Sequence, residues 1–161
     1  MSKINNNSMA IACASGGFKT IFIHGVLSAF EEANIKADAY ASASGSVIPS
    51  AWAAIGKARE SGMKYWLEGL KVHHQTKSMS QVCLGGISYF YDRGGQQLFE
   101  LNQPDFYIAT SAVTSNEAAE QTQGKQARRL GKKLLVSAAK KDRSWVNKHL
   151  IIELFGSARK G

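Results

Sequence analysis

A serine flanked by small residues is the feature of this sequence that most directly suggests catalysis. Residues 42–46 read Ser-Ala-Ser-Gly-Ser, between an apolar strand candidate (residues 37–43) and a helix candidate (residues 47–58). So tight a turn accepts only small neighbours and lifts the central hydroxyl to the start of the next helix, where free amides and the helix dipole favour negative charge. The pattern predicts a nucleophile elbow centred on Ser44, with Ser42, Gly45 and Ser46 beside it. Taken alone, such a pentapeptide more often marks a plain turn.

A glycine turn lies upstream of this serine. Ser15, Gly16, Gly17, Phe18, Lys19 and Thr20 follow an apolar run, residues 9–14, and open a helical pattern. Adjacent glycines let successive N–H groups point at one spot, which can hold a phosphate or the oxyanion of an acyl-transfer reaction. The alternatives are a plain strand-to-helix turn and a dinucleotide site. The G-x-G-x-x-G spacing of dinucleotide sites is absent, so we discount the latter.

The elements that would position these two turns alternate between strand and helix. The residues after the glycine turn form an apolar helical face with Glu31, Glu32 and Lys36 on the polar side, and Asn34 is a suitable stop. The apolar residues of this face are Ile21, Ile23, Val26, Leu27 and Phe30. A further strand is expected at residues 105–110, after Pro104. This alternation predicts an α/β fold with a mainly parallel sheet.

Between the second turn and this further strand the pattern is more mixed. Residues 62–74 predict a short helix with Trp66, Leu67 and Leu70 facing inward. Ile87, Tyr89 and Tyr91 alternate with other side chains, which predicts an extended segment. Residues 96–101 suggest a helical turn.

Together, the two turns resemble the patatin-like phospholipase family over about residues 9–56. The family's Gly-Gly-Gly-x-Arg/Lys-Gly turn corresponds to residues 15–20, and its Gly-x-Ser-x-Gly elbow falls on residues 42–46 without a gap. A fainter likeness covers residues 106–110, and we see none beyond about residue 120. The resemblance implies a three-layer α/β/α fold and one domain over residues 1–161, its motifs in residues 9–120 and a basic helical segment in residues 121–161.

The resemblance also implies a Ser–Asp dyad that hydrolyses lipid or simple esters without a metal or organic cofactor. Ser44 would be the nucleophile, and the amides of Gly16, Gly17 and Phe18 would form the oxyanion hole. Ser15, Lys19 and Thr20 would support that loop. Lys19 matches the family's basic residue, although it could equally be a solvated residue at a helix start.

The chain departs from the family at four glycines and at the aspartate. Ser15, Thr20, Ser42 and Ser46 stand where the family has glycine, and a β-branched Thr20 would be costly if its φ had to be positive. The family's Asp-Gly-Gly or Asp-Gly-Ala motif is absent. Asp92 precedes Arg-Gly-Gly, but it comes before the expected strand at residues 106–110, and Asp38, Asp105 and Asp142 fit turn or solvated positions better. The chain is therefore expected to be either an incomplete domain or a short form lacking the base.

Histidine and cysteine offer no clear substitute for the aspartate. We expect His24 to pack in the first helix, His73 and His74 to be exposed, and His149 to lie in a basic tail. The two cysteines, Cys13 and Cys83, show no metal-ligand spacing with the histidines. We expect them to be buried or free thiols. Free thiols in a chain without a signal-peptide pattern predict a cytoplasmic protein.

Charge is concentrated near the end of the chain. Residues 125–161 hold 11 Lys/Arg and 2 Asp/Glu, whereas residues 1–124 hold 9 and 10, so the net charge of +8 comes from the final segment. Leu130, Leu134, Leu135 and Ala138 fall at helical spacing among its basic residues. A basic amphipathic helix over residues 125–148 predicts attraction to an anionic membrane surface, and a merely solvated face is an equal alternative.

The remaining patterns set the limits of these expectations. Trp145, Leu150, Ile151, Ile152, Leu154 and Phe155 form a second apolar cluster, which would pack inward or drive self-association. Residues 3–8 suggest a loose arm, and no apolar run is long enough to span a membrane. The rival to an enzyme is a non-catalytic relative that binds acyl lipid or a protein partner. Nucleic-acid binding is a weaker option, because only the basic tail supports it and no nucleic-acid motif is present.

Overall fold

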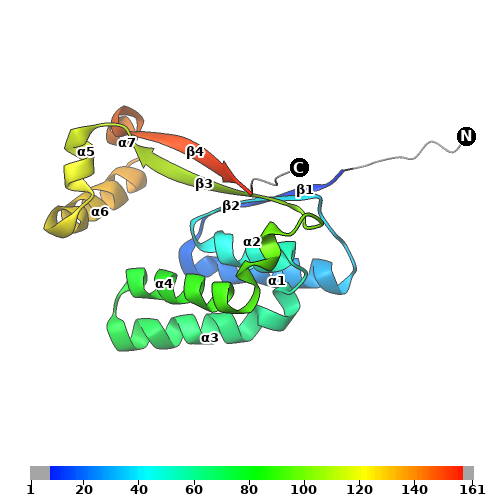
Figure 1. The fold of residues 1–161 in the computed structure, drawn as a ribbon. Coiled ribbons are helices and arrows are strands. Elements are labelled where there is room, and N and C mark those ends of the chain that lie inside the picture. The colour runs from blue at the N-terminus through cyan, green and yellow to red at the C-terminus, as the bar shows by residue number, and fades with distance from the viewer. Residues whose placement is uncertain (1–7, 158–161) are drawn as a thin grey trace, which may run out of the picture. The chain divides into compact units, whose positions relative to one another are not determined.

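The computed structural model describes residues 8–157 and divides the chain into two compact units. Among these residues, the first unit comprises residues 8–109 and 154–157, and the second comprises residues 110–153. A mainly parallel sheet with strand order β1-β2-β3-β4 runs through the described residues (Figure 1). The predicted mixed α/β class with a mainly parallel sheet is confirmed. The predicted arm at residues 3–8 lies, except for Ser8, outside the described residues.

Parallel strands form the frame of the first unit. β1 (Ala10–Cys13) pairs with β2 (Ala39–Ala43), and β2 pairs with β3 (Asp105–Val113). The helix α1 (Ile21–Glu32) connects β1 to β2, and it ends where Asn34 adopts a φ of 55°, as the sequence predicts. The connection from β2 to β3 contains α2 (Val47–Ala54), α3 (Ala58–Thr76) and α4 (Met79–Phe90).

These four helices cover one face of β1–β3 in the first unit (Figure 1). The cause is topological, because consecutive parallel strands joined by right-handed crossovers bring each crossover to the same face. The buried core lies between the layers and includes Leu27, Tyr40, Trp52, Phe90 and Phe106. In the described residues of this unit we therefore observe one helical layer on the sheet, where the sequence-based expectation was one on each face.

Of two predictions about the helical layer, one is wrong and one is confirmed only in part. Residues 87–91 are not extended, because they belong to α4 and to a π-helical turn, Tyr91–Gly95. The Ser78 side chain caps α4 by accepting a hydrogen bond from the Gln81 amide at 3.4 Å, which favours the helix. The predicted short helix at residues 62–74 is part of the longer α3. Trp66 is buried there, but Leu67 and Leu70 are more than half exposed.

The second unit holds the basic segment. α5 (Asn116–Gln121), α6 (Gly124–Ala139) and α7 (Ser144–His149) follow β3, and β4 (Leu150–Gly156) then returns. The strands β3 and β4 are antiparallel, as two hydrogen bonds at opposite ends of the pair show. The Thr114 amide donates to the His149 carbonyl at one end, and the Ser157 amide donates to the Phe106 carbonyl at the other. Within the second apolar cluster, Trp145 and Leu150 are half-buried, whereas the other four members are exposed: Ile151, Ile152, Leu154 and Phe155.

In the part of the chain that the structure describes, every helix is too short or too polar to cross a bilayer.

Candidate active site

The glycine turn begins directly after β1. Gly17–Thr20 form a single 3-10 turn preceding α1, and Gly17 has a φ of +55°, which glycine adopts without strain. The Lys19 amide donates to the Gly16 carbonyl at 3.1 Å. In a 3-10 turn each amide donates to the carbonyl three residues earlier, so the first amides, those of Gly17 and Phe18, have no acceptor within the turn. They can therefore donate to an incoming group. Gly16 and Gly17 are exposed, which keeps this end of the turn open to solvent.

The elbow begins directly after β2. Ser44–Ser46 form a 3-10 turn that leads into α2, and the Ser44 side chain is exposed. Ser44 has a φ of 56°, in the left-handed region that non-glycine residues seldom adopt. Such strained backbone at an exposed serine is a feature of nucleophile elbows and of functional sites in general. The left-handed backbone of Ser44 is a finding that the sequence pattern did not specify, and the role of Ser44 as a nucleophile stays a prediction.

The sheet brings the two turns to the same edge. Cys13 is in register with Ser42, so β1 and β2 end side by side and the chain leaves both strands at their carboxyl ends. In parallel α/β sheets this edge is where ligands bind. A Cβ atom built on Gly45 would lie 2.6 Å from the Gly17 carbonyl oxygen, so the backbones of the two turns approach more closely than any side chain would allow.

Thr20 connects the two turns through its side chain. Its hydroxyl lies 2.6 Å from the Gly17 carbonyl oxygen and 2.9 Å from that of Gly45, and the residue is only 1% exposed. The hydroxyl has one proton to share between these two acceptors. Sequence reasoning assigned Thr20 only a supporting place in the loop and missed this bridge. The sequence offered one indication of it, a hydroxyl residue directly before the apolar face of the helix.

The serines of the elbow other than Ser44 have structural roles. Ser46 is fully buried, and its hydroxyl lies 2.9 Å from the carbonyl oxygens of Cys13 and Ala43 while accepting from the Ala43 amide at 3.2 Å. It therefore ties the end of β2 to the end of β1. Ser42 is buried as well, and its hydroxyl donates to the Tyr107 carbonyl on β3 at 3.4 Å.

None of the four residues that replace family glycines needs a positive φ. Thr20 has a φ of −69° and Ser46 a φ of −83°, and Ser15 and Ser42 are not among the positive-φ residues of the described chain. The cost that the sequence suggested for Thr20 therefore does not arise. Glycine stands at the two places that require it, Gly17 for its φ and Gly45 for the close approach.

Phe18 and Lys19, the other two residues of the glycine turn, differ in their surroundings. The Phe18 ring lies 6.5 Å from that of Trp66 and 6.0 Å from that of His73, centroid to centroid, so it packs on α3. Lys19 is exposed. Its ammonium group can therefore add positive electrostatic potential near the turn.

His24 is a structural residue. It is 2% exposed, and its Nε2 lies 2.8 Å from the Ala58 carbonyl while its Nδ1 accepts from the Trp66 indole at 2.9 Å. This pairing fixes a neutral ring with the proton on Nε2. Burial is the main cause that lowers the pKa of His24, and the hydrogen bond to Ala58 acts in the opposite direction. The expectation that His24 packs in the first helix is confirmed.

The other histidines lie in varied surroundings. His73 is half-buried beside Phe18, and His74 is exposed. The prediction that His73 is exposed is thus wrong. His149, in the second unit, is buried, and its Nδ1 lies 2.8 Å from the Ser115 hydroxyl.

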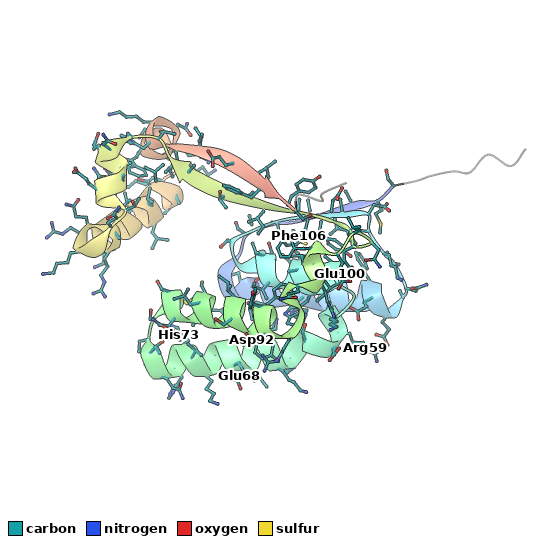
Figure 2. All side chains as sticks on the ribbon, in the orientation of Figure 1. Arg59, Glu68, His73, Asp92, Glu100 and Phe106 are labelled. Atoms are coloured by element: carbon teal, nitrogen blue, oxygen red, sulfur yellow. The ribbon has the colours of Figure 1, made fainter. Side chains whose placement is uncertain are left out.

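Asp92 lies on the π-helical turn Tyr91–Gly95 and is exposed. Figure 2 places Asp92 in the helical layer, whereas Phe106 lies at the sheet. The glycines that follow Asp92 serve packing, since a Cβ on Gly94 would lie 2.5 Å from the Ile55 side chain. The resemblance of this stretch to a catalytic Asp-Gly-Gly motif is therefore accounted for by close packing.

The remaining aspartates that the sequence singled out occupy strand or turn positions. Asp38 accepts from the Met9 amide at 2.7 Å, and Asp142 accepts from the Ser144 amide at 2.9 Å. That bond is the main cause that lowers the pKa of Asp142. Asp105 begins β3. Within residues 8–157, no hydrogen bond joins the Ser44 hydroxyl to a carboxylate or an imidazole.

Both cysteines are free thiols, as the sequence predicts, with Cys13 buried at the end of β1 and Cys83 exposed on α4. Across residues 8–157, His, Cys, Asp and Glu side chains do not gather in threes or more in a way that could hold a metal ion. Comparisons of the chain with protein-family models, with curated proteins and with solved structures found no match.

Proposed function

We propose that this chain is a serine acyl hydrolase of the patatin-like phospholipase type, which cleaves the carboxylic ester bonds of lipids or simple esters. The observation that carries the proposal is the contact between the two turns. An exposed serine with strained backbone lies in a turn whose next residue, Gly45, meets the Gly17 carbonyl at a distance that excludes any side chain. A nucleophile beside a turn of open amides is the arrangement that acyl transfer requires.

The proposed reaction has two stages. The Ser44 Oγ attacks the ester carbonyl carbon and gives its proton to a general base, while the carbonyl oxygen becomes an oxyanion that accepts hydrogen bonds from the amides of Gly16, Gly17 and Phe18. Collapse of this intermediate breaks the ester C–O bond, and the leaving alcohol takes the proton from the base. Water then attacks the acyl-serine and releases the acid in the same way. This chemistry uses no metal or organic cofactor.

The family resemblance implies an aspartate as the general base, but within residues 8–157 none of the chain's four aspartates is hydrogen-bonded to Ser44, so the proposal names no residue for this role. The proposal includes the family's three-layer fold, in which the face of β1–β3 opposite α1–α4 would carry a second helical layer. We further propose a cytoplasmic location, supported by the two free thiols, because cysteines stay reduced in that compartment.

Labelling with a fluorophosphonate probe, read by intact mass, tests the proposal. We expect the wild-type protein and Ser80→Ala, which alters an exposed serine of α4, to gain one adduct, and Ser44→Ala to gain none. Hydrolysis of a chromogenic ester should follow the same pattern. Circular dichroism should be alike for all three proteins, because both substitutions are small.

Two results would contradict the proposal. Retained labelling in Ser44→Ala would show that another group reacts. An unlabelled wild-type protein with a folded spectrum would instead favour the alternative, a patatin-like protein without catalysis that binds acyl lipid or a protein partner.

A further inference from the structure

The outward face of α6, in the second unit, combines exposed cations with exposed apolar residues. We infer that this face, which we call the α6 face, docks the protein on an anionic lipid surface, with phosphate headgroups bound by Lys125, Arg128, Arg129 and Lys132 and with Leu135 and Val136 entering the interface. This inference does not depend on the catalytic proposal.

Packing divides α6 into an inner and an outer side. Leu130 is buried, and Ala127 and Leu134 are half-buried, at positions three and four residues apart that share one side of the helix. The residues of the α6 face project from the other side and are all exposed: Lys125, Arg128, Arg129, Lys132, Leu135 and Val136. An amphipathic helix is thus present over Gly124–Ala139, shorter than the predicted residues 125–148, and Leu135, which the sequence grouped with the apolar side, is 74% exposed.

The cations of the α6 face are not neutralised by acidic side chains. The ion pairs found in residues 8–157 join Arg59 to Glu32 and Lys71 to Glu68, and both lie in the first unit. Exposed, unpaired Lys and Arg on one helix face attract anionic surfaces, each contributing about 1 kcal/mol near an anionic leaflet.

The cations also surround a common space. Gly124, Lys125, Arg128, Arg129 and Lys132 line one shallow depression beside α6. Guanidinium groups bind phosphate oxygens in bidentate fashion, and ammonium groups bind them as point charges. A depression bordered by two residues of each kind is suited to a phosphate headgroup.

The apolar residues favour lipid over nucleic acid as the partner. Leu135 and Val136 are 74% and 54% exposed, and they continue the α6 face one turn beyond Lys132, its last cation. Interfacial helices place such residues at the boundary between headgroups and acyl chains, and their binding grows with buried apolar area as well as with charge. A phosphate backbone in water would give Leu135 and Val136 no comparable apolar contact.

Vesicle co-sedimentation of the full chain tests the inference. The probes are vesicles of phosphatidylcholine alone and vesicles of equal parts phosphatidylcholine and phosphatidylserine. We expect binding to the anionic vesicles, and we expect Arg128→Gln/Lys132→Gln to weaken it roughly 30-fold. Lys36→Gln/Lys64→Gln removes the same charge from exposed sites in the first unit and should bind nearly as the wild type does.

A second pair of variants separates insertion from simple attraction. We expect Leu135→Gln/Val136→Gln to weaken binding to anionic vesicles at high salt, where charge attraction is screened, and Leu67→Gln/Leu70→Gln, at exposed sites of α3, to leave it unchanged. All these residues are exposed, so circular dichroism should be unaltered.

Three results would overturn the inference. Equal binding to neutral and anionic vesicles would show that charge attraction does not contribute to binding. Loss of binding with the charge variant but none with Leu135→Gln/Val136→Gln would show that no apolar insertion occurs. Binding of random-sequence DNA, steeply weakened by salt, without binding to vesicles would identify nucleic acid as the partner.

Discussion

The carbonyl oxygen of Gly17 lies only 2.6 Å from the point where a side chain on Gly45 would begin. These residues belong to turns that follow different strands, and the contact makes the two turns one structure. Any Cβ atom at position 45 would force them apart. The position of the turn amides relative to Ser44 therefore depends on a glycine that takes no part in chemistry itself.

Gly45→Ala should damage the site directly. We expect it to abolish labelling of Ser44 by the fluorophosphonate probe and to lower the free energy of unfolding by roughly 1–3 kcal/mol, because the backbone must shift to relieve the clash. Urea denaturation and intact mass measure the two effects. Gly25→Ala is the matched control, since a Cβ there meets nothing within 4 Å. That variant should label normally and gain up to about 1 kcal/mol from better helix propensity.

Thr20→Val tests the side-chain bridge between the turns. Valine keeps the shape but leaves the carbonyls of Gly17 and Gly45 without the hydroxyl, inside a buried site. We expect a loss of roughly 1–3 kcal/mol in unfolding free energy and slower labelling of Ser44. Thr76→Val removes a hydroxyl that donates to a carbonyl at 2.8 Å on an exposed helix end, and should cost under about 0.5 kcal/mol. Equal costs in the two variants would argue against the bridge.

The backbone of Ser44 should store measurable strain. A non-glycine residue in the left-handed region costs about 1 kcal/mol or slightly more, and glycine relieves it. We therefore expect Ser44→Gly to be more stable than Ser44→Ala by about that amount, in chemical denaturation, while neither reacts with the probe. Asn34→Gly has the same backbone conformation, with φ 55°, and should gain stability without losing reactivity. If Ser44→Gly were no more stable than Ser44→Ala, the strained backbone would be refuted.

His24 should make the protein less stable in mild acid. Burial lowers the pKa of His24 in the folded state below its ordinary value, so the unfolded chain takes up the proton first as the pH falls. The contribution of the neutral ring is complete above about pH 6.5 and is lost as the pH falls below that value toward the folded pKa. We expect the unfolding free energy to fall between about pH 7.5 and pH 5.5, with a slope of at most about 1.4 kcal/mol per pH unit from this group.

Variants isolate the His24 contribution from those of the other histidines. His24→Asn should be destabilised at every pH but should show a flatter pH dependence than the wild type, because the titrating ring is gone. His74→Asn removes an exposed imidazole and should keep the wild-type dependence. An unchanged slope in His24→Asn would contradict this account.

Local patterns predicted the turns and the first crossover well. The strands, the α1 helix and its stop at Asn34 follow from apolar spacing and from glycine placement, which act over a few residues. The α4 segment could not be predicted in this way, because the alternation of Ile87, Tyr89 and Tyr91 fits a strand and a helix equally well. In the helix, packing involves Val82 and Tyr89. Only the cap at Ser78 and the contact with α3 decide between strand and helix.

Burial was harder to predict than secondary structure. Leu67, Leu70 and Leu135 lie at core-like spacing yet are exposed, since spacing identifies a helix face but not what covers it. The roles of Thr20 and Ser46 depend on contacts across 25 and 33 residues of chain, which no local pattern contains. The place of Ser44 between a strand and a helix followed from local pattern, whereas its left-handed backbone and a partner for its proton did not.

The close approach at Gly45 bears on how such turns are recognised in sequences. Ser42 and Ser46 occupy the positions at which the usual motif demands glycine, and each uses its hydroxyl in a hydrogen bond to a neighbouring strand. The steric requirement in this chain falls instead on Gly45, directly after Ser44, and on Gly17 in the upstream turn. A search pattern written as small residues around a serine, paired with a glycine turn about 25–30 residues earlier, would retrieve chains that the standard Gly-x-Ser-x-Gly expression passes over.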